Sequence, residues 1–221
     1  MTALDSKQRF NLVRFKETPV LAIIRGAPQN AIEGILNACI LGGIKFVELT
    51  LNSGNALSLI AFACQKFSKD LCVGAGTVLS LTDVQLAAKA GANFIVSPTL
   101  NIDVATYCNK KGLAYFPGAL TPTEIENAWS AGASMVKVFP ASQMGANYFN
   151  TVRGPFNELL LMAVGGIDSS NAVDYFKAGA SAVAIGGSVF TESRMKNKKF
   201  NDIQQAISDL VISLKNFNHK L

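Results

Sequence analysis

The sequence predicts an α/β fold, a single (β/α)8 barrel in one domain over residues 1–221. The first observation behind this prediction is size and composition: 221 residues, 49% hydrophobic and 16% charged, suffice to bury one large core. The second is an alternation of short apolar runs with longer segments of helical spacing. The third is a glycine motif that recurs directly before several of the predicted strands.

Eight short apolar or β-branched runs are the expected strands. They lie at residues 20–24, 45–49, 71–73, 93–96, 113–116, 135–139, 160–164 and 182–185. The segments between them have the apolar spacing of helices, and several begin with Ser, Thr, Asn or Asp; examples are 83–90, 103–110, 123–131 and 171–178. An extra helix is expected at 5–16, before the first strand, and the last barrel helix at 201–214.

A weak internal repeat supports this alternation. The stretches AGANFIV, KGLAYF, AGASMVKVF and AGASAVAI each place a glycine just before a predicted strand. Glycine fits the left-handed conformation that follows the last turn of a helix, so each copy marks a helix that stops and a chain that turns into a strand. Repeated units of this kind build a parallel sheet. Eight of them without a long polar linker favour a closed barrel over an open sheet.

The composition excludes several classes of protein. The N-terminal stretch MTALDSKQRF has no apolar segment behind a basic one, and nowhere do about 18 uninterrupted apolar residues occur. We therefore expect neither a signal peptide nor a membrane partner. The four cysteines, Cys39, Cys64, Cys72 and Cys108, lie far apart without a CxxC pair. They are interpreted as reduced thiols of a cytoplasmic protein.

The net charge of +5 raises the question of a nucleic-acid partner. Part of the excess is local, in the stretch RMKNKK at 194–199 and near the C-terminus, and no aromatic residues are interleaved there for bases to stack on. A solvated basic surface is the better interpretation, so no nucleic-acid partner is expected. A modest positive field also suits an anionic small substrate.

In such barrels the chemistry gathers at the carboxyl ends of the strands, because the loops there converge on one mouth. Polar residues and glycines occur at these ends in this sequence. They are Arg25, Glu48, Thr77, Ser97, Pro98, Lys137, Gly165, Gly166, Gly186, Gly187 and Ser188. An active site is therefore expected at this end of the barrel.

Lys137 lies within a predicted buried strand, in the stretch GASMVKVFPAS. An amine among apolar side chains loses solvation of its charged form, so its pKa falls and the neutral nucleophile becomes available near neutral pH. Such a lysine can form a Schiff base with a carbonyl substrate, and Glu48 is the carboxylate expected to move protons. The one histidine, His219, lies near the C-terminus and is a poor base. The alternative is a surface lysine, or a buried Lys137–Glu48 ion pair without chemistry.

Two glycine pairs form a second group, in VGGI at 164–167 and IGGSVF at 185–190. Glycines after the seventh and eighth strands of a barrel let backbone N–H groups approach phosphate oxygens, and Ser188 can add a donor. The alternative is that they only permit tight turns. The stretch GAGTVL at 74–79 lacks the third glycine of a dinucleotide fingerprint, and no metal-ligand spacing occurs. We therefore expect no cofactor and no metal.

Seven motifs together resemble the KHG/KDPG aldolase family, class I aldolases that cleave 2-keto-3-deoxy-6-phospho sugar acids. They are VELTLNS, VGAGTVL, IVSP, VKVFPAS, RGPF, AVGGI and IGGS, in order over residues 19–190. The resemblance implies a homotrimer that splits a phosphorylated sugar acid into pyruvate and glyceraldehyde 3-phosphate. It implies Lys137 as the Schiff-base lysine and Glu48 as the general acid/base. It further implies a pyruvate pocket at Thr77, Pro98 and Phe139, and phosphate binding at Gly165, Gly166, Gly186, Gly187 and Ser188.

Two positions depart from the commoner family pattern. Many gluconate-type members have an arginine for the pyruvate carboxylate where this chain has Asn52, whereas Arg25 matches an arginine that other members carry after the first strand. Val164 stands where a threonine hydroxyl would meet the substrate, which should alter the preferred sugar stereochemistry. Both departures resemble the members that act on 2-keto-3-deoxy-6-phosphogalactonate.

Two other functions stay open on the sequence. One is a sugar-phosphate epimerase or decarboxylase, which would share the glycine loops but would not need Lys137 to form an imine. The other is a non-catalytic barrel that binds a sugar acid. Trapping of an imine would separate the three functions.

Overall fold

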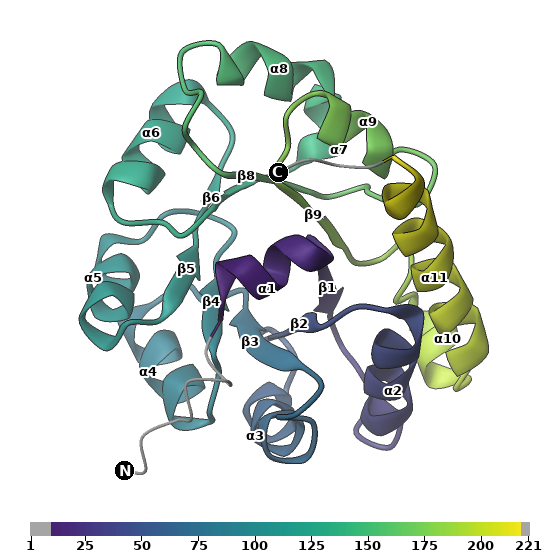
Figure 1. Cartoon of the computed structure of the whole chain (residues 1–221). Coiled ribbons are helices and arrows are strands. Elements are labelled where there is room, and N and C mark those ends of the chain that lie inside the picture. Colours follow the sequence, from purple (N-terminus) through teal and green to yellow (C-terminus); the bar gives the residue numbers. More distant parts are fainter. Residues whose placement is uncertain (1–9, 218–221) are drawn as a thin grey trace.

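In the computed structural model, which describes residues 10–217, parallel strands form an inner ring and helices surround it (Figure 1). The strands are β1 (Val20–Ile24), β2 (Phe46–Thr50), β3 (Cys72–Gly76), β4 (Phe94–Val96), β5 (Ala114–Phe116), β6 (Gly118–Ala119), β7 (Val136–Val138), β8 (Leu161–Val164) and β9 (Ala182–Ile185). They are ordered β5-β4-β3-β2-β1-β9-β8-β7-β6 in the nine-stranded sheet.

The two ends of this sheet, β5 and β6, are consecutive in the chain and separated only by Pro117. Proline has no N–H to donate to a strand ladder, which explains the interruption. Its carbonyl oxygen still accepts a hydrogen bond of 2.9 Å from the backbone N–H of Lys137 on β7. β5 and β6 thus act as one barrel strand, and the eight expected strands are confirmed.

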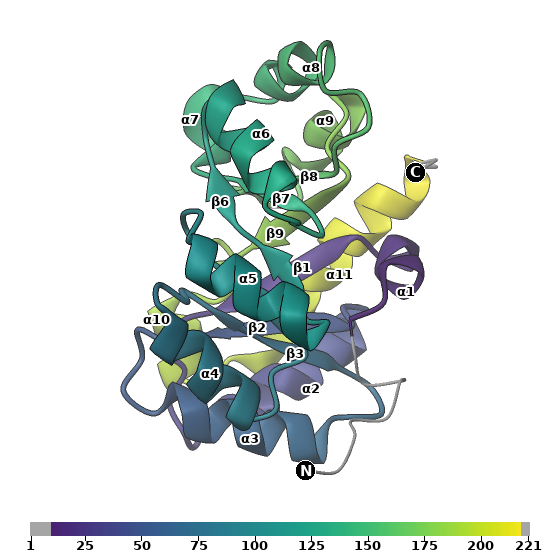
Figure 2. The same cartoon turned by 90° about the vertical axis from the view of Figure 1, so that its left-hand side faces the viewer.

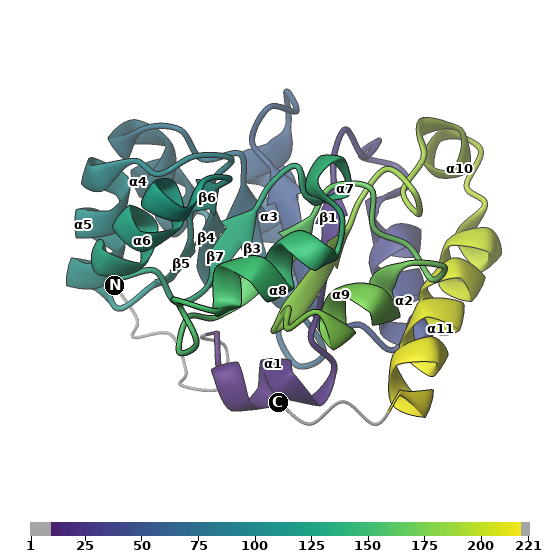
Figure 3. The same ribbon diagram turned by 90° about the horizontal axis from the view of Figure 1, so that it is seen from above.

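Most of the helices surround the barrel, whereas α1 lies at one end of it and α7 and α10 at the other (Figure 3). The helices are α1 (Leu12–Glu17), α2 (Ile32–Gly42), α3 (Ala56–Lys66), α4 (Leu81–Lys89), α5 (Ile102–Lys111), α6 (Pro122–Ser130), α7 (Ala141–Met144), α8 (Asn147–Arg153), α9 (Ala172–Lys177), α10 (Glu192–Lys196) and α11 (Phe200–Asn216). Figure 2 shows α4, α5 and α6 in succession along one side of the barrel.

Local sequence signals account for several helix ends. Thr121 and Glu124 form a reciprocal capping box at the start of α6, with Pro122 in its first turn. The repeat glycines Gly91, Gly112 and Gly132 have positive φ angles of 97°, 63° and 91°. The fourth repeat glycine, at position 179, has a φ of 94°. The predicted left-handed turn from helix to strand is therefore confirmed in all four copies.

The extra N-terminal helix is shorter than the predicted 5–16. Asn11 is extended, with a φ of −127°, and its side chain accepts a hydrogen bond from the backbone N–H of Arg14. This N-cap starts α1 at Leu12, so residues 10 and 11 are not helical, while 5–9 lie outside the described residues. The C-terminal helix is confirmed and runs a little beyond the predicted 201–214. His219 also lies outside the described residues.

Helix α1 lies across one end of the barrel, opposite the end at which α7 and α10 lie (Figures 1 and 3). Phe10 packs on Phe15, Phe46, Phe94 and Phe116, with ring centroids 5.0–5.9 Å apart. These residues belong to a cluster inside the barrel, separate from the larger apolar core that contacts the helices. The amino ends of the strands are thus covered by α1 and filled by aromatic rings.

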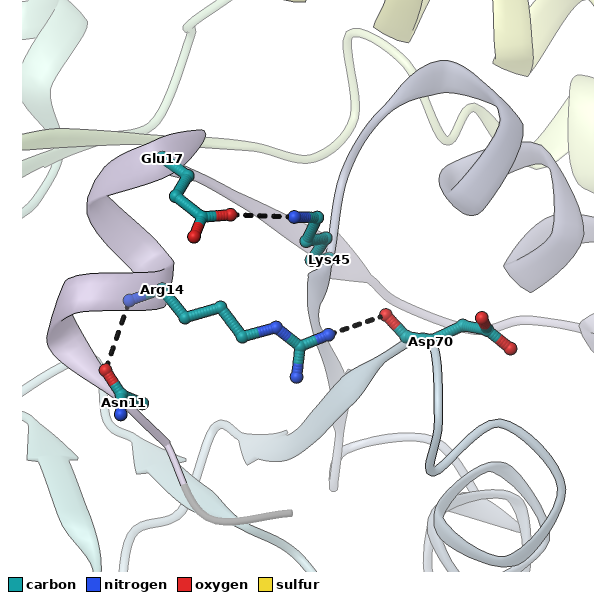
Figure 4. Close-up of polar contacts among 5 residues, drawn as sticks. All are labelled: Asn11, Arg14, Glu17, Lys45 and Asp70. Atoms are coloured by element: carbon teal, nitrogen blue, oxygen red, sulfur yellow. Dashed lines mark hydrogen bonds and ion pairs between the residues drawn. The ribbon is translucent and has the colours of Figure 1, made fainter. Parts of the chain in front are cut away.

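Polar contacts hold α1 in this position (Figure 4). The Arg14 guanidinium donates a hydrogen bond of 3.2 Å to the backbone carbonyl oxygen of Asp70, before β3. Glu17 forms an ion pair of 2.8 Å with Lys45, before β2. Any cavity that reaches the interior of the barrel is therefore expected at the opposite end, where the strands finish.

Candidate active site

A cavity of about 650 Å³ opens at the carboxyl ends of the strands. Its walls include every predicted site residue except Glu48. These are Arg25, Asn52, Thr77, Pro98, Lys137, Phe139, Gly165, Gly166, Gly186, Gly187 and Ser188. The structure thus brings together residues from seven strand ends that are up to 163 positions apart in the chain.

Lys137 reaches this cavity from the interior of the barrel. Successive residues of a strand face opposite sides, and Lys137 alternates with Val136 and Val138, which pack in the outer core. It therefore shares its side with Met135, a member of the inner cluster. The residue is only 7% exposed, and its Nζ lies 5.2 Å from the centroid of the Phe139 ring.

Burial is the main cause of an altered pKa at Lys137. It lowers the pKa of the amine from the ordinary 10.5, the Glu48 carboxylate opposes this change, and Arg25 adds to it. The direction is the one expected for a lysine nucleophile, because a lower pKa leaves more of the neutral amine near pH 7.

Glu48 lies behind the cavity wall, on the inward-facing side of β2. It alternates with Val47 and Leu49 of the outer core and shares its side with Phe46 of the inner cluster. Glu48 is 1% exposed, and its Oε2 atom has no hydrogen-bond partner in the part of the chain that the structure describes. Gly76 on β3 leaves room for the carboxylate, because a Cβ atom there would lie 2.2 Å from Glu48 Oε1.

The protonation of Glu48 is also set mainly by burial. Burial raises the pKa of Glu48 from 4.5 to about 7, although Lys137 and Arg25 act in the opposite direction. A carboxyl with this pKa can both accept and donate a proton near neutral pH. None of the ion pairs that residues 10–217 form joins Glu48 to Lys137. The two groups therefore influence each other without the direct contact of a structural salt bridge.

Arg25 and Asn52 lie at the exposed rim of the cavity, after β1 and β2. The loops that carry them are joined, since the backbone N–H of Gly26 donates a hydrogen bond of 2.9 Å to the Ser53 hydroxyl oxygen. Arg25 is close enough to lower the pKa of both Glu48 and Lys137. It supplies a positive charge on the wall formed by β1.

Thr77 has a φ of 57°, a left-handed conformation that is unfavourable for a β-branched residue. Neighbouring contacts hold this turn in place. The backbone N–H of Val78 donates to the carbonyl oxygen of Val96, and the Ser97 hydroxyl donates to the carbonyl oxygen of Val78 at 2.6 Å. Strained backbone of this kind concentrates at functional sites, and here it places Thr77 beside Pro98 on the cavity wall.

The first glycine loop follows β8. Gly165 and Gly166 have φ angles of 99° and 74°, and Cβ atoms there would lie 3.2 Å from the Phe139 ring and 2.6 Å from the Ser142 side chain. Both the backbone conformation and the close neighbours therefore favour glycine. Both glycines also line the cavity.

The second glycine loop follows β9. The Ser188 hydroxyl donates a hydrogen bond of 2.7 Å to the carbonyl oxygen of Ile167, which joins the two loops. The hydroxyl that we expected to be a donor for a ligand is thus used within the protein. The backbone N–H groups of Gly187 and Ser188 have no hydrogen-bond acceptor among residues 10–217. Backbone N–H groups without an acceptor in the protein are suited to donate to a ligand in the cavity.

Sequence reasoning missed the contribution of α10. We interpreted the stretch RMKNKK as a solvated surface, but Met195 and Lys196 of this stretch line the cavity together with Glu192. Lys196 forms an exposed ion pair with Glu192, with Nζ and Oε1 2.5 Å apart. The sequence does contain a signal for this contribution. The basic stretch begins only four residues after Phe190, where the second glycine loop ends, so it could have been expected near that loop.

Within the described part of the chain, no three His, Cys, Asp or Glu side chains are grouped as a metal ion would require. In the same residues, no helix has both the length and the apolar character needed to cross a bilayer.

A parallel α/β barrel with a buried lysine that faces its mouth and a buried carboxylate behind the cavity wall has the features of barrel enzymes that use lysine as a nucleophile. Comparison with known proteins identifies the family. The sequence pattern of the KDPG and KHG aldolases matches residues 12–206. This chain belongs to the KDPG and KHG aldolase family.

Two curated relatives are each 35% identical to this chain. One is a probable 2-dehydro-3-deoxy-6-phosphogalactonate aldolase of Rhizobium meliloti, aligned over 79% of this chain and 82% of the relative. The other is a 2-dehydro-3-deoxy-phosphogluconate aldolase of Treponema pallidum, aligned over 80% of this chain and 82% of the relative.

Solved structures agree with this assignment. A structure described as native KDPGal is 26% identical, has a TM-score of 0.85, and covers 90% of this chain and 95% of its own. KDPG aldolase from Legionella pneumophila, with pyruvate captured at low pH as a covalent carbinolamine intermediate, is 25% identical with a TM-score of 0.82. That alignment covers 89% of this chain and 95% of the Legionella chain.

Proposed function

We propose that this protein is a class I aldolase that cleaves a 2-keto-3-deoxy-6-phospho sugar acid into pyruvate and glyceraldehyde 3-phosphate. The observation that carries the proposal is Lys137, a 7% exposed amine that faces a cavity and has no salt-bridge partner among residues 10–217. Its membership of the KDPG and KHG aldolase family supports the same reaction. An epimerase or decarboxylase would not need this amine.

The reaction begins with attack of neutral Lys137 on the C2 carbonyl carbon of the substrate. Water leaves, and the resulting iminium accepts an electron pair more readily than the original ketone. Arg25 and the turn at Thr77 hold the carboxylate next to this carbon, because they supply a positive charge and polar groups to the same cavity. Pro98 and Phe139 form the apolar part of the pyruvate pocket.

Cleavage follows when Glu48 receives the proton of the C4 hydroxyl. The electrons of the C3–C4 bond move toward the iminium nitrogen, which leaves an enamine on Lys137 and releases glyceraldehyde 3-phosphate. The pKa of about 7 suits Glu48 to this role, since it can accept a proton here and return one to the enamine. Hydrolysis of the imine then frees pyruvate and restores the amine.

The far end of the substrate is anchored by the two glycine loops. Gly165, Gly166, Gly186, Gly187 and Ser188 present backbone N–H groups to the phosphate, as loops after the seventh and eighth strands of barrels often do. Lys196 supplies a nearby ammonium group that can exchange its exposed partner, Glu192, for the phosphate. Binding energy from this remote group orients the C3–C4 bond for cleavage.

Of the two epimers, we propose that 2-keto-3-deoxy-6-phosphogalactonate is preferred. Val164 lines the cavity and offers no hydroxyl to the sugar chain. Asn52 at the rim is uncharged, so the positive charge there comes from Arg25. A wall that hydrogen-bonds a substrate hydroxyl rejects an unmatched pattern more strongly than an apolar wall does. The gluconate epimer is expected to be a weaker substrate.

We also propose a homotrimer in the cytoplasm. Apolar side chains exposed at and near α4 and α5 support self-association: Leu79 is 52% exposed, Leu81 40%, Leu86 42% and Ile102 60%. Asn101 donates to the carbonyl oxygen of Leu79, so these segments are adjacent. None of the four cysteines, which all lie within residues 10–217, is in a disulfide, and this fits a reducing compartment.

The deciding experiment is incubation with pyruvate and borohydride, followed by intact mass and peptide mapping. We expect one pyruvyl adduct on Lys137, its absence in Lys137→Met, and its persistence in Lys177→Met, a control at an exposed lysine. Folding of each variant is checked by circular dichroism. A folded wild-type protein without the adduct would overturn the proposal in favour of imine-free chemistry or binding alone.

A further inference from the structure

Asn171 is a polar side chain that the reaction described above does not use. It is the N-cap residue of α9, a position at which an asparagine side chain usually accepts a hydrogen bond from the first turn of its helix. Asn171 makes no such bond. Its Nδ2 donates a hydrogen bond of 2.8 Å to the carbonyl oxygen of Gly166, and its Oδ1 accepts one of 3.1 Å from the backbone N–H of Asp168. Asn171 therefore holds the first glycine loop instead of its own helix.

The carbonyl oxygens of this loop are occupied within the protein. Three consecutive ones accept hydrogen bonds from three different segments: Gly165 from the Ser142 N–H at 3.1 Å, Gly166 from Asn171, and Ile167 from the Ser188 hydroxyl. In contrast, the backbone N–H groups of Gly166 and Ile167 have no acceptor among residues 10–217. Ile167 is 1% exposed, so its N–H is also buried. Buried backbone N–H groups are nearly always hydrogen-bonded, so this one indicates an acceptor that those residues do not supply.

One peptide unit links Asn171 to this unpaired N–H. The Gly166–Ile167 peptide is trans, so its carbonyl and its N–H point in opposite directions. Because Asn171 binds the carbonyl oxygen, the Ile167 N–H points away from Asn171. Gly166 lines the cavity, whereas Asn171 does not. This is the orientation required of a donor to a ligand in the cavity.

The loop needs such a contact because its own backbone does not determine the direction of this peptide. Gly165 and Gly166 have positive φ angles of 99° and 74°, and glycine has access to more backbone conformations than any other residue. A peptide released from Asn171 could rotate and present its carbonyl oxygen to the cavity. A carbonyl oxygen repels an anion, whereas successive N–H groups bind one. The Asn171 amide therefore decides whether this part of the loop favours a phosphate.

We propose that Asn171 is a positioning residue for the substrate phosphate; the proposal rests on the aldolase function proposed above. Its side-chain amide holds the Gly166 carbonyl oxygen, and the N–H groups of Gly166 and Ile167 donate to phosphate oxygens. Asn171 does not touch the substrate and acts only through the loop. Its contribution therefore depends on the phosphate and not on the keto-acid end of the substrate, to which Lys137 binds.

The test uses Asn171→Ser, because serine is also a favourable N-cap residue but lacks the amide that holds Gly166. We expect KM for the phosphorylated sugar acid to rise about 10-fold, with kcat within about 3-fold of wild type, since hydrogen bonds to a charged group are weakened. The inhibition constant of inorganic phosphate should rise by about the same factor. Pyruvate carries no phosphate, so the pyruvate concentration that gives half-maximal borohydride trapping should stay at the wild-type value.

Asn109→Ser is the matched control. The Nδ2 atom of Asn109, on α5, donates a hydrogen bond of 3.0 Å to the carbonyl oxygen of Ala131, the C-cap residue of α6. Asn109 therefore also holds a backbone carbonyl oxygen, but it does not line the active-site cavity. The variant should lose stability without a change in KM or in the inhibition by phosphate. This control separates the general cost of losing such a hydrogen bond from the effect proposed for Asn171.

The outcomes distinguish this proposal from the aldolase function. Wild-type KM and phosphate inhibition in Asn171→Ser would overturn the positioning role, and so would an equal weakening of pyruvate trapping or an equal effect of Asn109→Ser. If Asn171→Ser does not fold, Asn171→Asp replaces it, with the same expected difference between phosphate and pyruvate. Its carboxylate still accepts from the Asp168 N–H but does not donate to Gly166. Failure of the folded wild-type protein to trap pyruvate would instead overturn the aldolase function itself.

Discussion

The substitution Gly76→Ala tests whether the fixed position of the Glu48 carboxylate matters. The added Cβ would lie 2.2 Å from Glu48 Oε1 and 2.7 Å from its Cδ. The shorter separation is 1.2 Å less than the 3.4 Å at which ordinary contacts begin, so the carboxylate has to retreat by about 1 Å. Gly76 does not have a positive φ, so the backbone can accept alanine without strain.

A displacement of this size has a predictable effect on catalysis. A misplacement of about 1 Å in a reacting group can reduce a rate about 10²-fold. We therefore expect kcat for cleavage to fall about 100-fold in Gly76→Ala. Lys137 is untouched, so the pyruvate adduct should still form after borohydride treatment.

The assay is pyruvate release from the phosphorylated sugar acid, with circular dichroism and thermal unfolding measured in parallel. Gly54→Ala is the matched control, because among the described residues, apart from its chain neighbours, no atom lies within 4 Å of the added Cβ, and the φ of Gly54 is not positive. Gly74→Ala shows the different effect of a core clash, since its Cβ would lie 2.3 Å from the Phe94 ring. Overpacking of that kind costs about 1–3 kcal/mol of stability. A Gly76→Ala variant with wild-type kcat would refute the reasoning.

Four further predictions concern charge, stability and specificity. Glu48→Gln should lower kcat about 10²- to 10⁴-fold and remove the fall in wild-type kcat/KM below about pH 7, because the base is lost. The raised pKa also means that the folded state holds this proton more tightly than the unfolded chain. Wild-type free energy of unfolding should therefore decrease as pH rises from 4.5 to about 7, and urea titrations should find less of this decrease in Glu48→Gln. Lys196→Gln should raise KM for the phosphorylated substrate about 3- to 10-fold, because a charge that binds the phosphate is lost. Lys199→Gln is the control, since Lys199 does not line the cavity and its loss should leave KM unchanged. An equal effect of both substitutions would contradict phosphate binding by Lys196. Val164→Thr should raise kcat/KM for the gluconate epimer relative to the galactonate epimer, and an unchanged ratio measured on both substrates would exclude Val164 as the determinant.

Much of the barrel follows from patterns that are local in the sequence. The strands β1 and β9 have the predicted bounds because their apolar runs are bordered by residues that end a strand. The left-handed turns at the helix ends were also predictable, because few residues other than glycine adopt a positive φ. The third strand was predicted too short, since Gly74 and Gly76 carry no strand signal, although they make room for Phe94 and Glu48.

The direction of the two central side chains was not available from the sequence. In a parallel barrel both faces of a strand are buried, so apolar neighbours on either side of Lys137 and Glu48 do not reveal which face is the interior. The structure resolves this through Met135 and Phe46, which share the side of the two polar residues and belong to the inner cluster. Lys196 was missed for a related reason, because its approach to the cavity depends on how α10 folds back over the mouth.

The aromatic closure of the barrel by α1 has a consequence for the order in which products depart. Within residues 10–217, Phe10 and Phe15 pack with the cluster inside the barrel at the end that α1 covers, and the cavity that reaches Lys137 opens at the opposite end. In the proposed reaction the three-carbon acid stays covalently attached to Lys137, while the phosphorylated aldehyde occupies the outer glycine loops. The aldehyde must depart first and clear the route for the water that hydrolyses the imine. The covalent bond to Lys137 sets this order of release, and the closed amino end means that both products leave by the same route.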